Sequence, residues 1–413
     1  MLFADEFGYA ALRPLVASGE IVRVREGAYF TPSNAADTWE REMEVALAHA
    51  VGVVGTLGCD HVLSHQTAAL VHGCWVGRLD GDTHITQRTK PRDNDVLGLR
   101  RHVAQWEEAD VVAIEGLPVT SLERTIEDCA RFLTPREGLL VADSGLRVLA
   151  RPDRFDRVAS EIRLEEHRRL IQGRLVPKKG WRGIARGRAV LAAADGFAES
   201  AGESRLRWVA LSRGLPRPVC QFPVETERGQ FFLDFAWPQK EGGQEFPDGA
   251  RVLGEEYDGR AKYGDEIAGT TGRPNQALFE EKLREDALRT TGVRLRRRVA
   301  EDLHDPDRVA DDMRRRFPSA AAAPSSPFEV FSSSYCPAKL PQWGGLRREA
   351  WRDSDEGRIE SGHDLPTRPP GSPARGTRPA EGPAPRRFRR GGRPRAGAAD
   401  RRGRPPAGGD RAA

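Results

Sequence analysis

The sequence has 413 residues, of which 38% are hydrophobic, 31% charged and 7% aromatic, and its formal net charge is +4. At roughly 100–200 residues per domain, this length allows two or three domains with a hydrophobic core. No apolar run approaches the ~18–20 residues of a membrane span, and no signal-peptide pattern is present, so we expect no membrane partner. Five scattered cysteines, an odd number, form no disulfide framework and favour a cytoplasmic protein.

Charge is distributed unevenly along the chain. The segment from Ala338 to Ala413 holds about 18 Lys and Arg against about 9 Asp and Glu, a surplus near +9 that leaves about −5 for the rest. From residue 318 onward Pro, Gly, Ser, Ala and Arg dominate, and such a segment buries too little apolar surface to offset the entropy of ordering. We therefore interpret residues 318–413 as a disordered basic tail, either an arm that binds phosphates or a merely solvated extension.

Residues 1–36 predict a winged-helix-like, DNA-binding region. Residues 12–20 (LRPLVASGE) read as a short helix, and residues 21–30 (IVRVREGAYF) alternate apolar and polar residues as a hairpin does. Helix, strand, strand is the order of a winged helix, although only about ten residues precede this helix, so the fold's first helix would be shortened. The candidate phosphate-binding residues are Arg13, Arg23 and Arg25. The alternative is that the hairpin only packs against the next helix.

Residues 37–150 mix helical and strand patterns. Ser64 and Ser121 are the expected N-caps of two helices, the second of which carries apolar residues at helical spacing. Helices are expected over 37–54, 64–73 and 121–133, and strands over 83–87 and 102–106. An Arg-rich helical bridge over 151–195 follows.

The pattern of predicted helices and strands changes over residues 196–317. An amphipathic helix is followed by a strand pair, a third strand that ends in a turn, a charged helix and a last strand with a short helix. The corresponding segments are GESRLRWVALSRGL, QFPVET, QFFLDFAW, RVLGEEYDG, FEEKLREDALRTTG and VRLRRRVAEDL. The order predicts a compact α/β unit, and the whole chain is therefore expected to be α/β, of the mixed α+β kind.

Acidic residues of this unit stand where metal-assisted phosphodiester cleavage needs them. Asp234 has apolar neighbours on both sides of its strand, and Glu256 and Asp258, two apart, share a face of the next strand. Together Asp234 and Glu256 offer the hard oxygen ligands that Mg²⁺ prefers. Glu203 is placed to orient the metal's water, and Lys262 either to stabilise developing charge or to activate the attacking water. The alternative is an ordinary turn at the end of the strand.

The C-terminal unit resembles a known family. The runs GESRLR, LDFAWP, GEEYDGRAKY and FEEKLREDALRTTGVRLRR are similar to the small nuclease-like domain related to very-short-patch-repair endonucleases, within the PD-(D/E)XK superfamily. The runs LVASGEIVRVREGAYF, LSHQTAALVHG and LPVTSLERTIEDCAR resemble an AbiEi-type antitoxin region. The resemblance spans residues 10 to 317. It implies a type IV toxin–antitoxin or phage-defence setting, a DNA-binding winged helix, and a cognate toxin or its gene's operator as partner.

The resemblance also assigns roles to residues. Asp234 matches the first catalytic Asp of the superfamily, Glu256 matches the acid of the second catalytic strand, and Glu203 matches the acid of the first helix. Arg284 and Asp286 fall in the basic–acidic pattern of the following helix, where they either contact the site or only cap and pair.

The catalytic lysine departs from the family pattern. It should stand two residues after the acid, where this chain has Asp258, while Lys262 comes four residues further on. No histidine follows the EYDG turn either. The pattern therefore favours Mg²⁺ binding more strongly than turnover.

Two other groups of residues carry weaker signals. A cluster of cysteines and histidines lacks the spacing of a zinc site, and a basic strand either tracks a phosphate backbone or is simply exposed. The cluster is Cys59, His61, His65, His72 and Cys74, and the basic strand presents Arg294 and Arg296.

Three hypotheses follow. The first is a DNA-binding regulator of the antitoxin type whose nuclease-like domain binds nucleic acid without cutting. The second is an active Mg²⁺-dependent endonuclease, and the third a protein-binding neutraliser that never touches DNA. The sequence predicts neither the oligomeric state nor the DNA target.

Overall fold

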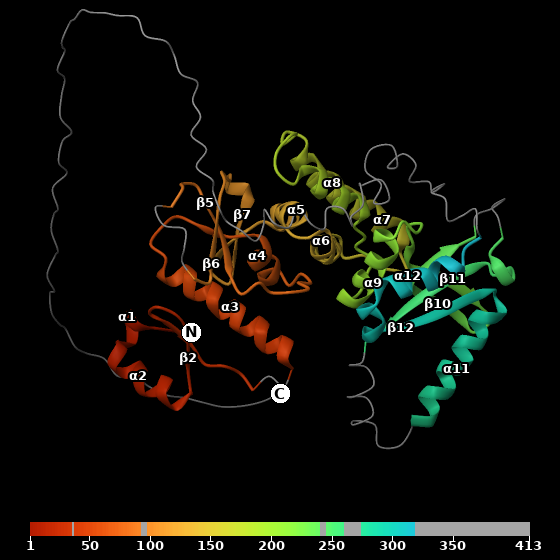
Figure 1. The fold of residues 1–413 in the computed structure, drawn as a ribbon, viewed down its shortest axis with the longest axis horizontal. Helices are drawn as coiled ribbons and strands as arrows, with labels where there is room; N and C mark the ends of the chain where they lie inside the picture. The colour runs from red at the N-terminus through yellow and green to blue at the C-terminus, as the bar shows by residue number, and fades with distance from the viewer. Residues whose placement is uncertain (35–36, 92–96, 240–244, 260–273, 319–413) are drawn as a thin grey trace, which may run out of the picture. The chain divides into compact units, whose positions relative to one another are not determined.

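The computed structural model describes residues 1–34, 37–91, 97–239, 245–259 and 274–318. Within them the chain is mixed α/β, as the sequence predicts, and its strands form three sheets (Figure 1). The strand orders are β1-β3-β2, β6-β5-β4-β8-β7 and β12-β11-β10-β9. None of the helices described is both long and apolar enough to cross a bilayer. The predicted tail falls outside the described residues, apart from Pro318.

The N-terminal region has the predicted order of helix, strand and strand. Its elements are β1 (Leu2–Phe3), α1 (Ala4–Phe7), α2 (Tyr9–Ser18), β2 (Val22–Arg25) and β3 (Ala28–Phe30). Helix α2 ends at Gly19, whose φ of 78° is the left-handed conformation that glycine adopts without a steric penalty. Leu12 of α2 packs with Ile21 and Tyr29 in a small core. Strand β1 was not predicted, because two residues are too few to show alternation, and it pairs antiparallel with β3.

Helix α3 (Thr38–Thr56) packs against this hairpin through small residues. A Cβ at Gly52 would lie 3.2 Å from the Cβ of Ala28, so a larger residue there would push the strand away. The Asp37 side chain accepts hydrogen bonds from the N–H groups of Trp39 and Glu40, which fixes the start of the helix. The opposite side of α3 faces the next sheet.

The middle region follows the prediction closely but not everywhere. Its elements are β4 (Val62–Leu63), α4 (His65–Val71), β5 (Thr83–Gln87), β6 (Leu99–Val103), β7 (Val111–Ile114), β8 (Leu117–Thr120), α5 (Leu122–Phe132) and α6 (Pro135–Ala150). Strand β5 has the predicted bounds, and Ser121 caps α5 by accepting from the N–H of Arg124. The strand expected over 102–106 begins three residues earlier, directly after Gly98, whose φ of 73° makes the turn.

The bridge and the C-terminal unit also match their predicted order. The bridge forms α7 (Arg157–Leu175) and α8 (Ile184–Ala193). The C-terminal unit forms α9 (Ala201–Ser212), β9 (Val219–Thr226), β10 (Gly229–Pro238), β11 (Val252–Asp258), α11 (Pro274–Thr290), β12 (Val293–Val299) and α12 (Pro306–Arg315). Strands β10 and β11 are antiparallel, whereas β11 and β12 are parallel and joined through α11.

A buried ion pair ties α9 to α6. The Arg207 guanidinium lies 2.6 Å from both carboxylate oxygens of Asp143 and donates to the carbonyl of Ala193 at 2.7 Å. Asp143 also accepts from the Ser204 hydroxyl and from the N–H of Asp195. Both charged side chains are essentially inaccessible to water, and the largest apolar core cluster continues around them from α5 to α12. The C-terminal unit is therefore packed against the α5–α6 helices through a charged as well as an apolar contact.

Candidate functional site

Two of the predicted acidic residues meet beside the first turn of α9. The Ser200 hydroxyl caps this helix by accepting from the N–H of Glu203, and the Glu203 carboxylate accepts from the N–H of Glu199 at 2.8 Å. Asp234, on β10, accepts from the N–H of Tyr257 at 2.7 Å, which ties the carboxylate to the neighbouring strand β11. Both carboxylates are thus held in place by backbone donors.

The Glu203 and Asp234 carboxylates lie close enough for the charge of Asp234 to affect the pKa of Glu203. Burial raises the pKa of Glu203 to about 7, and the charge of Asp234 adds to the rise. Two close carboxylates favour a state in which only one is ionised, or in which a cation lies between them.

Tyr257 fixes the distance between β11 and α9. A Cβ at Gly202 would lie 1.9 Å from Cε1 of the Tyr257 ring, so only glycine leaves room for the ring at this point of the helix. Gly202 stands one residue before Glu203, and Tyr257 donates its N–H to Asp234. The contact therefore positions both members of the carboxylate pair.

The third acidic residue, Glu256, is engaged by arginines. Arg284 of α11 donates to both of its carboxylate oxygens, through Nη1 to Oε2 at 3.2 Å and through Nη2 to Oε1. Arg297 of β12, which is the register partner of Glu256, places its Nε 3.4 Å from Oε2. The sequence left open whether Arg284 contacts the site, and the structure places it there. Asp286, in contrast, pairs with Arg289 on the same helix and does not join the site.

The adjacent acidic residue, Glu255, points to the opposite face of β11, and the sequence pattern assigns it no role. It is fully buried, and burial raises its pKa even though guanidinium groups surround it. Arg298 donates to it at 2.8 Å, Arg316 donates to its other oxygen, and Arg298 also pairs with Asp312. Alternation along the strand places Glu255 and Glu256 on opposite faces. The Glu255 cluster is a structural anchor for α12.

Mg²⁺ is usually held by one or two carboxylates together with waters and substrate phosphate. No group of three or more His, Cys, Asp or Glu side chains among them is arranged to hold a metal ion. One carboxylate oxygen of Glu203 and one of Asp234 accept from backbone N–H groups, and both oxygens of Glu256 are held by guanidinium groups. Lys262 lies outside the described residues. The residues therefore fit a Mg²⁺ ion only in part, and no catalytic step is derived through one.

The arginines predicted to contact DNA differ in their surroundings. Arg13 on α2 and Arg23 on β2 are exposed. Arg25 is half-buried and donates to the Thr56 hydroxyl of α3 at 3.0 Å, so it serves in part to attach the hairpin to that helix. Arg294 and Arg296 are exposed on β12, an edge strand of its sheet.

Three histidines of the middle region, His65, His84 and His102, pack together. His65, with an unusual positive φ of 51°, stacks on His102 at a ring-centroid distance of 3.6 Å. Nε2 of His102 lies 3.1 Å from Nδ1 of His84, and the other nitrogen of His84 lies 2.9 Å from an oxygen of Asp80. Burial lowers the pKa of His102 to about 3, with a further contribution from the charge of His84. Sequence spacing does not identify His84 or His102 as members of this group, because they come from strands β5 and β6.

The chain is similar in sequence to two uncharacterized mycobacterial proteins. No protein-family model matches it. It is 29% identical over 225 residues to the uncharacterized proteins MT2308 and Rv2248 of Mycobacterium tuberculosis strains CDC 1551 / Oshkosh and ATCC 25618 / H37Rv, covering 54% of this chain and 72% of each relative. A structural comparison pairs it with the crystal structure of the RV2827C protein from the same species, at 17% identity and a TM-score of 0.25, over 44% of this chain and 68% of that one.

Proposed function

We propose that this chain is a DNA-binding regulator of the antitoxin type, acting in a type IV toxin–antitoxin or phage-defence system, whose nuclease-like part binds nucleic acid without cutting it. The DNA-binding half of the proposal is supported by the exposed Arg13 on α2 and Arg23 on the hairpin. Arginines on a helix and an adjacent wing make phosphate contacts, which set the position of a protein on DNA. The cognate toxin, or the operator of its gene, is the expected partner.

One observation carries the choice of a binder over an enzyme, namely the pairing of Glu256 with Arg284 and Arg297. A carboxylate held by two guanidinium groups has lost the excess negative charge that attracts a divalent cation. Arg284 also faces the charge of Asp234, so guanidinium groups offset acidic charge on the face that a phosphate backbone would approach.

The test is DNA affinity as a function of salt. Fluorescence anisotropy of the full chain with duplexes from the promoter of its own gene, and with random duplexes, is expected to give binding that weakens steeply with salt. The Arg13→Ser/Arg23→Ser double variant should reduce the slope of log affinity against log salt by about 2, roughly one for each lost phosphate contact. Arg169→Ser, on exposed α7, is the matched control. A flat salt dependence would overturn the proposal and favour the protein-binding neutraliser.

A second candidate, a Mg²⁺-dependent endonuclease, is favoured by the Glu203–Asp234 pair. The raised pKa of Glu203 reflects burial and a repulsion from Asp234 that a bound cation would relieve. Plasmid cleavage with Mg²⁺ or Mn²⁺, comparing the wild type with Asp234→Ala and Glu256→Ala, separates the two functions. Metal-dependent cutting that both variants lose would establish the enzyme, whereas retained DNA binding without cutting supports the regulator.

A further inference from the structure

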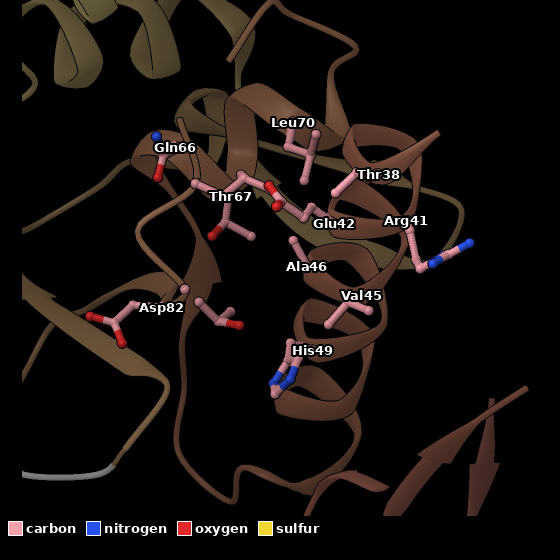
Figure 2. Close-up of a pocket in the computed structure, with 13 residues that line it drawn as sticks. Thr38, Arg41, Glu42, Val45, Ala46, His49, Gln66, Thr67, Leu70 and Asp82 are labelled. Carbon is pink, nitrogen blue, oxygen red and sulfur yellow. The ribbon is translucent and has the colours of Figure 1, made fainter. Parts of the chain in front are cut away.

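A cavity of about 480 Å³ lies between α3, α4 and the segment that leads into β5 (Figure 2). This volume falls within the range of sites that hold small organic molecules. Its apolar wall consists of Val45 and Ala46 from α3, Leu70 from α4, and Leu79. None of these residues belongs to the acidic site or to the arginines discussed above.

The polar groups of the cavity come mainly from one side of α3. In Figure 2 the Glu42 side chain extends from α3 towards Thr67, His49 lies further along the same helix, and Arg41 points away. Glu42 and His49 are seven positions apart, which corresponds to about 10 Å along a helix axis. Glu42 is exposed where it lines the cavity, and within the described part of the chain its carboxylate has no ion-pair or hydrogen-bond partner. The cavity therefore has an acidic end and an imidazole end with apolar side chains between them.

The two ends differ in the charge that they accept. Glu42 attracts a cation. At the other end, burial and the charge of Arg25 lower the pKa of His49, so the imidazole is neutral at physiological pH and exchanges ordinary hydrogen bonds. The positive charge of Arg25 also disfavours a second cation there. Asp82, on the opposite wall, is already paired with Arg100 at 2.9 Å.

We propose that this cavity binds a small primary amine with an apolar body. The ammonium group pairs with Glu42, the apolar body packs against Val45, Ala46 and Leu70, and a neutral hydrogen-bonding group at the far end meets His49. Diamines fit less well because Arg25 repels their second charge, and carboxylates are repelled by Glu42. This binding does not depend on the proposed DNA-binding function.

The test uses the full chain with tryptamine, which combines an ammonium group, an aromatic body and an indole N–H donor. Isothermal titration calorimetry and thermal unfolding are expected to show that tryptamine binds and stabilises, while 3-indolepropionate, which has a related ring system and a carboxylate, does not. Glu42→Gln should weaken tryptamine binding about tenfold, because a charge-assisted hydrogen bond is lost. Glu40→Gln, on an exposed position of the same helix, should leave the affinity unchanged.

Filling the cavity provides the second arm of the test. Ala46→Trp should abolish tryptamine binding, and the smaller Ala46→Leu should weaken it if the tryptophan variant fails to fold. Unchanged affinity in Ala46→Leu and Glu42→Gln would overturn the proposal, as would equal binding of the amine and the carboxylate. Absence of binding by tryptamine, phenethylamine and cyclohexylmethylamine at millimolar concentration would overturn it as well.

Discussion

Replacing Glu203 by glutamine should change how the free energy of unfolding depends on pH. In the folded chain the pKa of Glu203 is about 7, because of burial and then the charge of Asp234, against an ordinary value of 4.5. The folded state therefore resists ionisation, and stability is lost as pH rises from about 4.5 to about 7. This difference in pKa corresponds to about 3 kcal/mol. Glutamine mimics the protonated acid and can still accept from the N–H of Glu199.

Glu203→Gln should accordingly match the wild type near pH 4.5 and exceed its stability by about 3 kcal/mol at pH 8. Urea unfolding, followed by circular dichroism at both pH values, measures the difference. Asp234→Asn should remove only part of the wild-type pH dependence, because burial remains. Glu166→Gln, at an exposed position of α7, is the matched control. If the stability difference between Glu203→Gln and the wild type is the same at both pH values, the argument for a strained carboxylate pair is refuted.

Three further changes test buried contacts, two of them beside the acidic site and one in the histidine group of the middle region. Arg207→Met should lower the free energy of unfolding in urea by about 3–5 kcal/mol, because it leaves Asp143 buried without its guanidinium partner. Adding Asp143→Leu should recover most of this loss. If the effects of the two substitutions are instead purely additive, the prediction is contradicted. Gly202→Ala should lower the free energy of unfolding by about 1–3 kcal/mol, because the added methyl group clashes with the Tyr257 ring. The Tyr257→Ala background should relieve this clash. An unchanged melting temperature of Gly202→Ala would contradict the prediction. Because burial keeps the pKa of His102 near 3, the unfolding free energy should fall by about 1.4 kcal/mol per pH unit as the solution is acidified from 6.5, and His102→Asn should remove this contribution. If the free energy of unfolding depends on pH in the same way in His102→Asn and the wild type, the lowered pKa of His102 does not contribute to acid sensitivity.

Local signals were sufficient for much of the fold. Strand β5 and the Ser121 cap of α5 were predicted because alternation and capping act over a few residues. Strand β8 was missed because its four residues directly precede that cap and resemble the start of the helix. Its strand character comes from pairing with β4 and β7, which the local sequence does not encode.

The candidate site was predictable only in part for a related reason. Asp234 was identified from its apolar neighbours, Glu256 from its spacing to Asp258, and Glu203 from its place on the first predicted helix of the unit. Their actual environment depends on residues far along the chain. Arg284 reaches Glu256 from 28 positions away, and no rule of sequence spacing reveals whether a carboxylate faces a guanidinium group or a metal ion.

The Arg207–Asp143 pair also limits how this chain can be rearranged in evolution. Recombination that exchanged the C-terminal unit for that of a relative would join an unmatched α9 to α6, and a single foreign side chain there would leave one buried charge without its partner. Only exchanges that carry both residues, or replace both with apolar ones, would yield a stable chimera. The helices around α6 and the C-terminal unit are therefore expected to be inherited as one module.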